Sequence, residues 1–348
     1  MMAFAGSAHA GKAGTTPPAS GKTGAASGPG KTVTPGAGSA GAIPIERRQF
    51  GATDMSVTVL GFGGAEIGYQ QVEQGIVDRL LNSALDAGLN VIDTAECYAG
   101  SEEAIGKAVS SRRKEFHLFT KVGHMEQGEA GWTSASIAKS IDRSLERLRT
   151  DHLDLVQLHS CSLDILRKGD CIAALELAKK QGKTRYIGYS GDSTAALHAI
   201  ESGRFDTLQT SVSIADQECI ALTIPKAKER NMGVIAKRPI ANAAWRHDAE
   251  PKDDYGHEYW VRLQKLAYDF ATGDARSTSG PDGAAGVALR FTLAVPGVHV
   301  AIVGTSKPER WKQNAEMLRD GGPLPREKFE AIRARWKEVA AADWTGRT

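Results

Sequence analysis

Cysteine is scarce in this sequence, and long apolar runs and a strong net charge are missing from it. The 348 residues include four cysteines, Cys97, Cys161, Cys171 and Cys219, which form no CxxC pair and no metal-ligand spacing. Such a set fits a reducing compartment rather than a disulfide framework. No apolar run approaches the roughly 18 to 20 residues of a membrane-spanning helix. The formal net charge of +2 gives no case for binding nucleic acid. We therefore expect a soluble, cytoplasmic protein.

Glycine signatures for nucleotide phosphates are incomplete as well. Residues 21–23 and 30–32 both read Gly-Lys-Thr, but Thr16 and Ala25 stand where a phosphate-binding loop requires its first glycine. The turn at residues 60–64 fails the GxGxxG spacing, because Glu66 replaces the third glycine. Neither a P-loop nor a dinucleotide fold of the Rossmann type is predicted.

The first 45 residues contain no acidic residue and no arginine, and Ala, Gly, Ser, Thr and Pro dominate them. This composition predicts a disordered low-complexity tail. A targeting role for the tail stays an open alternative, although no apolar secretory core is visible. Residues 46–348 are long enough for one closed barrel domain of about 250 to 300 residues.

Three short apolar segments each lead into a polar residue of chemical interest. They are residues 89–92 before Asp93, 116–119 before Thr120-Lys121, and 153–158 before His159. Each segment is typical of a buried strand. In a barrel of parallel strands, residues at successive strand ends converge on one pocket. Asp93, Lys121 and His159 are therefore expected to be neighbours, together with Tyr98 in the loop after Asp93.

This group fits proton transfer to a carbonyl oxygen. A free phenol has a pKa of about 10, so Tyr98 would need a nearby cation to stabilise its phenolate, and Lys121 is the candidate. A buried ammonium needs a counter-charge, which Asp93 provides. His159 is expected to hydrogen-bond the substrate oxygen. An alternative makes Lys121 the Schiff-base lysine of an aldolase-like lyase, although Asp93 would keep that lysine charged.

On these residues the chain resembles the aldo-keto reductase family. The matching segments read Asn-Val-Ile-Asp-Thr-Ala-Glu-Cys-Tyr at 90–98, Ser-Glu-Glu at 101–103, Thr-Lys at 120–121 and Gln-Leu-His at 157–159. The resemblance covers roughly residues 45 to 320. It implies a (β/α)8 TIM barrel, a nicotinamide cofactor held without a Rossmann domain, and reduction of a small aldehyde or ketone with Tyr98 as proton donor. A slow-turnover NADPH-binding regulatory module remains the alternative within the same resemblance.

The resemblance also implies a cofactor site. Ser190 and Gln209 match the residues that hold the nicotinamide carboxamide, and Lys237 stands where many members stack an aromatic ring on the nicotinamide. Arg238 is a candidate for the pyrophosphate. The segment that would grip the adenosine phosphate contributes Gly304, Thr305, Ser306, Lys307, Arg310, Gln313 and Asn314.

The last of these segments has a physical rationale of its own. Pro308 suits the first position of a helix, whose N-terminus attracts anions. Lys307 and Arg310 add positive charge there, which favours the 2′-phosphate of NADPH over NADH. Taken alone, the same pattern is typical of an ordinary helix start with surface charges.

Further elements are expected around this site. A hairpin at 47–59 would plug the barrel bottom, and later strands near 184–189, 206–210, 233–238 and 299–303 would complete eight. Ile137, Ile141, Leu145 and Leu148 form an apolar helical stripe. The long connection 241–286 is expected to be a lid or substrate wall, with Tyr259-Trp260 either packing a helix or contacting substrate. Trp132 is another candidate pocket wall, and Cys97 is expected to be a small buried filler.

Overall fold

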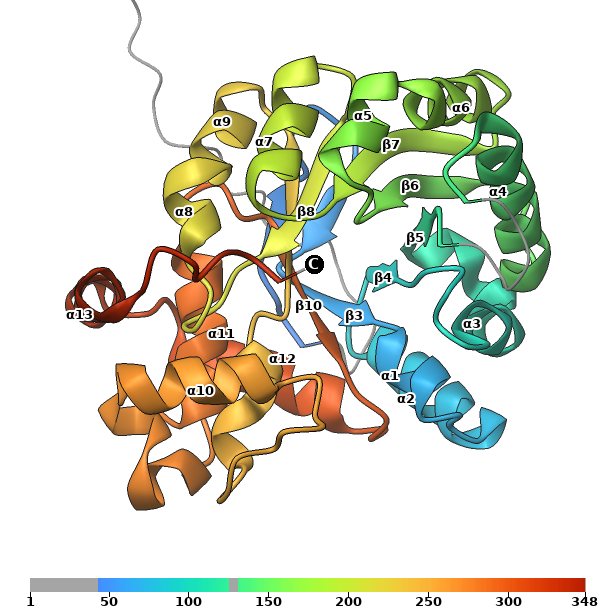
Figure 1. The fold of residues 1–348 in the computed structure, drawn as a ribbon. Helices are drawn as coiled ribbons and strands as arrows, with labels where there is room; N and C mark the ends of the chain where they lie inside the picture. The colour runs from blue at the N-terminus through green and yellow to red at the C-terminus, as the bar shows by residue number, and fades with distance from the viewer. Residues whose placement is uncertain (1–42, 125–130, 348) are drawn as a thin grey trace, which may run out of the picture. The chain divides into compact units, whose positions relative to one another are not determined.

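The computed structural model describes residues 43–124 and 131–347, and within them eight parallel strands close into a barrel (Figure 1). The tail expected over residues 1 to 45 lies almost entirely outside the described residues. The barrel strands are β3 (Leu60–Gly63), β4 (Val91–Asp93), β5 (His117–Val122), β6 (Leu153–His159), β7 (Thr184–Ser190), β8 (Thr207–Ser211), β9 (Gly233–Lys237) and β10 (Val300–Gly304). All four strands expected late in the chain are confirmed.

Strand order follows the chain, and β10 closes the barrel by pairing with both β3 and β9. The strands are almost wholly buried because helices cover their outer face and side chains fill the interior. Parallel pairing puts every carboxyl end at one rim, which we call the mouth. Asp93, His159 and Ser190 therefore come to the same rim from β4, β6 and β7.

A two-stranded hairpin closes the opposite end, which we call the bottom. It consists of β1 (Arg47–Gln49) and β2 (Ser56–Thr58). Phe50 in its turn is fully buried and stacks on Phe119 of the barrel interior, with ring centroids 5.7 Å apart. Gly51 has φ +58°, and a Cβ there would lie 2.3 Å from the backbone nitrogen of Gly233. The hairpin expected from the sequence is confirmed as a plug.

Helices alternate with the strands and surround the barrel (Figure 1). They are α1 (Ala65–Tyr69), α2 (Gln74–Asp86), α3 (Ser101–Val109), α4 (Ser134–Leu148), α5 (Leu163–Lys168), α6 (Asp170–Lys180), α7 (Ser193–Ser202), α8 (Glu218–Leu222), α9 (Ile224–Glu229), α10 (His257–Leu266), α11 (Ala284–Ala294), α12 (Arg310–Gly321) and α13 (Arg326–Val339), with 3-10 turns η1 (Ser110–Glu115), η2 (Ala241–Arg246), η3 (Asp269–Ala271) and η4 (Gly273–Ser277). In the part of the chain that the structure describes, no helix is both long and apolar enough to cross a bilayer.

Helix α4 illustrates how local sequence sets these elements. Thr133 caps it: the threonine hydroxyl accepts from the backbone N–H of Ser136, and the Ser136 hydroxyl oxygen accepts from the backbone N–H of Thr133. Such a capping box typically stabilises a helix by about 1 kcal/mol. Ile137, Ile141 and Leu148 then bury the expected stripe against the barrel.

The long connection 241–286 packs mainly on the helices beside the barrel. Trp245 and Tyr259 are buried in a second apolar cluster that also contains Trp336 of α13. These aromatic side chains are therefore helix-packing residues. Tyr255 differs, since it is 72% exposed and its hydroxyl accepts a hydrogen bond from Arg238 at the mouth.

Candidate active site

The structure brings Asp93, Tyr98 and Lys121 together at the mouth, as the strand-end argument predicts. Lys121 Nζ donates to the Asp93 carboxylate and, at 2.9 Å, to the carbonyl oxygen of Thr94. It lies 3.4 Å from the Tyr98 hydroxyl, at the outer limit of a hydrogen bond. Both Lys121 and Asp93 are 1% exposed, so the ion pair is sealed from water. The Asp93 carboxylate is therefore the buried counter-charge of this lysine.

Asp93 is held by more than the lysine. Its second oxygen accepts hydrogen bonds from Gln209 Nε2 at 2.9 Å and Gln157 Nε2 at 3.3 Å. Complete burial nevertheless raises the pKa of Asp93, an effect that Lys121 and the two amides only partly offset. The carboxylate is thus fixed in one position by three donors from β5, β6 and β8.

The pKa of Tyr98 moves opposite to the direction that the sequence argument expected. Burial, followed by the nearby Asp93 carboxylate, holds it well above its usual value. The negative charge of Asp93 raises the pKa of the Tyr98 phenol, so the Lys121 ammonium does not lower that pKa on balance. In this environment the Tyr98 hydroxyl keeps its proton.

His159 joins the group as a neutral imidazole. Its ring stands edge-on to the Tyr98 ring, with centroids 5.5 Å apart. Burial, and next the Lys121 charge, hold the pKa of His159 well below its usual value. Its Nδ1 lies 3.4 Å from Cys97 Sγ, and burial raises the pKa of that thiol to about 11. A thiol that stays protonated can donate to Nδ1, which would leave the imidazole proton on Nε2. Cys97, expected to be a buried filler, is half-buried and contacts this histidine.

The residues expected to hold the nicotinamide are also neighbours. Ser190 Oγ donates to Gln209 Oε1 over 3.1 Å across β7 and β8. Lys237 ends β9, is 8% exposed, and places Nζ 2.9 Å from an Asp192 oxygen. Asp192 was not anticipated from the sequence. Lys237, the Ser211 backbone N–H and Thr210 keep its pKa below the usual value despite burial.

The segment after β10 departs from expectation at its helix. Helix α12 begins at Arg310 with Glu309 as its N-cap, so Pro308 lies in the preceding turn and not at the first helical position. The Lys307 backbone N–H donates to Thr305 Oγ1 at 3.0 Å, a side-chain contact that shapes this turn before the helix starts. Gly304 ends β10, Ser306 lies in the same turn, and Gln313 and Asn314 follow on α12. Among the described residues, the side chains of Lys307 and Arg310 have no ion-pair partner.

Comparison with known proteins identifies the family of this chain. The sequence pattern of the Aldo/keto reductase family matches residues 59–337. The chain belongs to the aldo/keto reductase family. Membership makes it an NAD(P)H-dependent oxidoreductase.

Individual relatives align with this chain over most of their length. An uncharacterized oxidoreductase of Bacillus subtilis, YqkF, is 27% identical over 307 residues, covering 84% of this chain and 97% of the relative. L-galactose dehydrogenase of Arabidopsis thaliana is 27% identical over 284 residues, covering 78% and 87%. The holo form of the aldo-keto reductase AKR11C1 from Bacillus halodurans superposes with a TM-score of 0.73 at 27% identity, covering 86% of this chain and 99% of that one. An aldo/keto reductase from Klebsiella pneumoniae in complex with NADP and acetate gives 0.63 at 25% identity, covering 80% and 91%.

Asp93, Tyr98, Lys121 and His159 are called the tetrad below. Two residues beside the tetrad of this aldo/keto reductase were missed in the sequence. His124 follows β5 by two residues, and its ring centroid lies 5.0 Å from that of His159. On its other side it meets Trp132, the expected pocket wall, at 5.4 Å. A Cβ on Gly123 would lie 2.2 Å from the Trp132 ring, so this glycine lets the indole reach the backbone. The signal was available, because the residues directly after Lys121 leave β5 at the same rim as the candidate site.

Glu66 is the second, and lies on α1 between Tyr98 and β10. A Cβ on Gly304 would meet a Glu66 carboxylate oxygen at 1.5 Å, so the side chain covers the end of β10. Burial raises the pKa of Glu66. The same helix packs against the Tyr98 loop through Gly68 and Tyr69. The sequence offered no signal beyond the broken glycine spacing.

Arg238 reaches the mouth at the end of β9. Its Nη1 donates to Ser211 Oγ at 2.9 Å, and its Nε donates to the Tyr255 hydroxyl at 3.0 Å. The guanidinium also lies 5.2 Å from the centroid of the Tyr255 ring. Arg238 adopts φ +54°, a left-handed conformation that is rare for arginine and turns its side chain back over the barrel rim.

Proposed function

We propose that this enzyme reduces an aldehyde or ketone to an alcohol with NADPH, with Tyr98 as the proton donor. The single observation that carries the proposal is the contact of the Tyr98 hydroxyl with the Lys121 ammonium at 3.4 Å, beside the neutral His159. Residues 46–348 form the catalytic domain in this proposal.

Proton donation does not require a strongly acidic phenol. When hydride reaches the carbonyl carbon, negative charge develops on the substrate oxygen, and an alkoxide is more basic than a phenolate. Tyr98 can therefore transfer its proton even with a raised pKa, and Lys121 stabilises the phenolate as it forms. His159, with its proton on Nε2, would donate a hydrogen bond to the same oxygen and orient the carbonyl.

The residues present fit a nicotinamide dinucleotide. When bound, the cofactor supplies the hydride. Ser190 and Gln209 offer hydroxyl and amide groups to its carboxamide, and the stem of Lys237 can lie along the ring while its ammonium stays on Asp192. Lys307 and Arg310, which have no ion-pair partner in the part of the chain that the structure describes, fit a 2′-phosphate, which supports NADPH. The Klebsiella structure, named as a complex with NADP, supports the same assignment.

Two other functions are less well supported. A Schiff-base lyase needs Lys121 as a neutral nucleophile, whereas the buried Asp93 contact favours the ammonium. A slow-turnover regulatory module would use the same cofactor site, so the residues of that site support it as much as they support the reductase.

Activity assays distinguish these functions. Purified protein should oxidise NADPH in the presence of simple aldehydes, followed by absorbance, and aldoses belong in the panel because one relative is named L-galactose dehydrogenase. Turnover with at least one carbonyl compound is expected. Tight NADPH binding without turnover on any of them would favour the regulatory module, and borohydride trapping of substrate on Lys121 would favour the lyase.

A further inference from the structure

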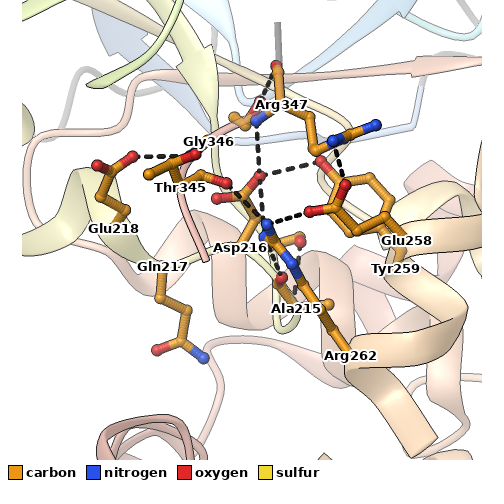
Figure 2. A network of polar contacts seen from close by, with 12 residues as sticks. Ala215, Asp216, Gln217, Glu218, Glu258, Tyr259, Arg262, Thr345, Gly346 and Arg347 are labelled. Atoms are coloured by element: carbon orange, nitrogen blue, oxygen red, sulfur yellow. Dashed lines mark hydrogen bonds and ion pairs between the residues drawn. The ribbon is translucent and has the colours of Figure 1, made fainter. Parts of the chain in front are cut away.

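Residues 344–347, which we call the strap, lie across the mouth and are not used by the proposed reaction. They follow α13, and in Figure 1 this dark-red segment runs back toward the centre of the barrel rim. Their contacts with the barrel join parts of the chain more than 100 residues apart, such as Ser211 with Arg347. Figure 2 shows the polar network that holds them.

The strap is anchored first by an aromatic ring. The Trp344 indole lies 5.3 Å from the Trp336 ring of α13. The Arg262 guanidinium of α10 lies 5.4 Å from the Trp344 ring centroid and donates to the carbonyl of Thr345 at 2.9 Å. Arg262 is 2% exposed, so this anchor is buried.

Carboxylates then fix the backbone of the strap. The Gly346 N–H donates to Glu218 Oε2 at 2.7 Å, and the Arg347 N–H donates to Asp216 Oδ2 at 3.3 Å. The Arg347 side chain forms an ion pair with Glu258 (Figure 2). Two charge-assisted hydrogen bonds and one ion pair therefore hold two consecutive residues, Gly346 and Arg347, in a single path.

The path ends on two donors of the barrel rim. The carbonyl oxygen of Arg347 accepts from Ser211 Oγ at 3.0 Å and from the Arg238 guanidinium. Ser211 is the last residue of β8, and Arg238 follows the last residue of β9. A guanidinium beside a hydroxyl is a donor set that suits a phosphate oxygen as well as a carbonyl.

The same point lies on the route of the cofactor. The barrel order is β7, β8, β9, β10. A dinucleotide with its carboxamide at Ser190 and Gln209, on β7 and β8, and its 2′-phosphate at Lys307 and Arg310, after β10, has to cross the end of β9. Arg238 stands there, already bound to the strap.

We propose that the strap competes with the pyrophosphate of the dinucleotide for Arg238 and Ser211, so that the cofactor binds only after the strap has left the end of β9. This inference rests on the proposed function. A phosphate oxygen carries a charge that a peptide carbonyl lacks, so the exchange at Arg238 favours the cofactor. The apparent dissociation constant is raised by the inverse of the fraction of molecules whose strap is displaced.

Gly346 offers a way to move the strap without altering any residue assigned to the cofactor. A Cβ at this position would lie 2.5 Å from the Asp192 Cβ, and Asp192 is tied to Lys237 and Thr210 and has little freedom to retreat. Gly346→Ala should therefore push the strap off the rim. Gly75→Ala in α2 is the matched control, because the nearest atoms to its added Cβ lie 3.9 Å away.

The test measures dissociation constants by calorimetry and association by stopped flow. Losing one such contact shifts an equilibrium by about fivefold, so Gly346→Ala should bind both NADPH and NADH at least about fivefold more tightly with their ratio unchanged. Association with wild-type protein should reach a concentration-independent limit, set by strap opening, that the variant lacks. Adenosine 2′-monophosphate, which has no pyrophosphate, should bind equally to both proteins, and Gly75→Ala should match wild type throughout.

Other results separate this inference from the function beneath it. Weaker or unchanged dinucleotide binding by Gly346→Ala would overturn the competition, and weaker binding would make the strap a wall of the cofactor site. If that variant fails to fold, Trp344→Ala, which removes the aromatic anchor, should give the same tightening. Wild-type protein that binds no nicotinamide dinucleotide would instead refute the proposed function.

Discussion

The bottom and the mouth of this barrel use the same residue type in opposite ways. At the bottom, Asp154 is the second residue of β6, lies beside His117, and accepts hydrogen bonds from Arg113, Arg185 and the Leu118 N–H. Together these partners hold the pKa of Asp154 well below the usual range despite burial. At the mouth, Asp93 ends β4 with one ammonium and two amides, and its pKa is raised. Both carboxyls are almost fully buried and accept from three donors, so the difference comes from the charge of those donors: two guanidinium groups at Asp154 and a single ammonium at Asp93.

The contrast shows that the ionised carboxylate stabilises the fold at the bottom and destabilises it at the mouth. A buried carboxylate surrounded by guanidinium and backbone donors stabilises the fold. Around the mouth the pKa values of Glu66, Asp93 and Asp216 are raised, as is that of Glu102, which accepts a hydrogen bond from Thr120 of β5, whereas Lys237 keeps that of Asp192 lowered. Incompletely paired groups of this kind are characteristic of functional sites. Four experiments test the comparison, in order of decreasing effect.

Tyr98→Phe should have the largest effect. Removing a general acid typically costs 10² to 10⁴, so we expect kcat to fall by about 10³ while the dissociation constant of NADPH stays within about twofold. Steady-state kinetics and calorimetry measure the two quantities. Tyr69→Phe is the control, since Tyr69 stacks 5.6 Å from Tyr98 but is largely exposed. A variant at Tyr98 that keeps wild-type turnover would remove this residue from the mechanism.

Asp154→Asn should act on stability and not on catalysis. Breaking a buried ion pair costs about 3 to 5 kcal/mol, so urea denaturation should show the free energy of unfolding reduced by about 3 kcal/mol with kcat unchanged at 25 °C. Asp164→Asn breaks an exposed pair with Arg167 and should cost less than about 0.5 kcal/mol. Loss of activity without loss of stability would contradict the division between bottom and mouth.

Lys307→Ala combined with Arg310→Ala tests whether the mouth binds the 2′-phosphate of NADPH. Both side chains lack partners among the described residues, so their removal should leave stability intact and raise the dissociation constant of NADPH by about 30-fold and that of NADH by less than about threefold. Lys312→Ala, two residues further along α12, should change neither constant. Equal losses for the two cofactors would refute the 2′-phosphate assignment.

The pH dependence of stability should show the two ends with opposite signs. Asp154 has a lowered folded pKa, so its contribution is present above about pH 4 and is lost as the pH falls through the folded value. Burial raises the pKa of Glu102 to about 7, so its contribution is present below about pH 4.3 and is lost as the pH rises through 7.

The glutamine of Glu102→Gln cannot titrate, so this variant should not lose stability as the pH rises through 7. The free energy of unfolding of this variant should therefore gain on that of wild type as the pH rises from 4.5 to 7.5, measured by urea denaturation at each pH. Asp154→Asn should show no such gain over this range. Parallel curves for wild type and Glu102→Gln would mean that Glu102 is ionised throughout.

Much of the barrel and the tetrad could be predicted from the chain, because short apolar strands and the polar residues after them are local signals. Asp93, Lys121 and His159 each follow such a strand, and one rule about parallel barrels brings them together. The start of α12 was misplaced by two residues, since Pro308 sits in a turn that precedes the Glu309 cap. Asp192, His124 and the strap lie outside any periodic pattern.

The sequence by itself determined the fold class, the family and the types of group at the mouth. Hydrophobic period, strand length and the residues at strand ends are encoded within a few positions of one another. Only the tertiary structure decided that Tyr98 has a raised pKa and that Arg238 turns back over the rim. It also decided that the Arg238 guanidinium donates to the carbonyl oxygen of Arg347. Those outcomes depend on burial and on contacts between residues more than 100 positions apart, and no local pattern carries that information.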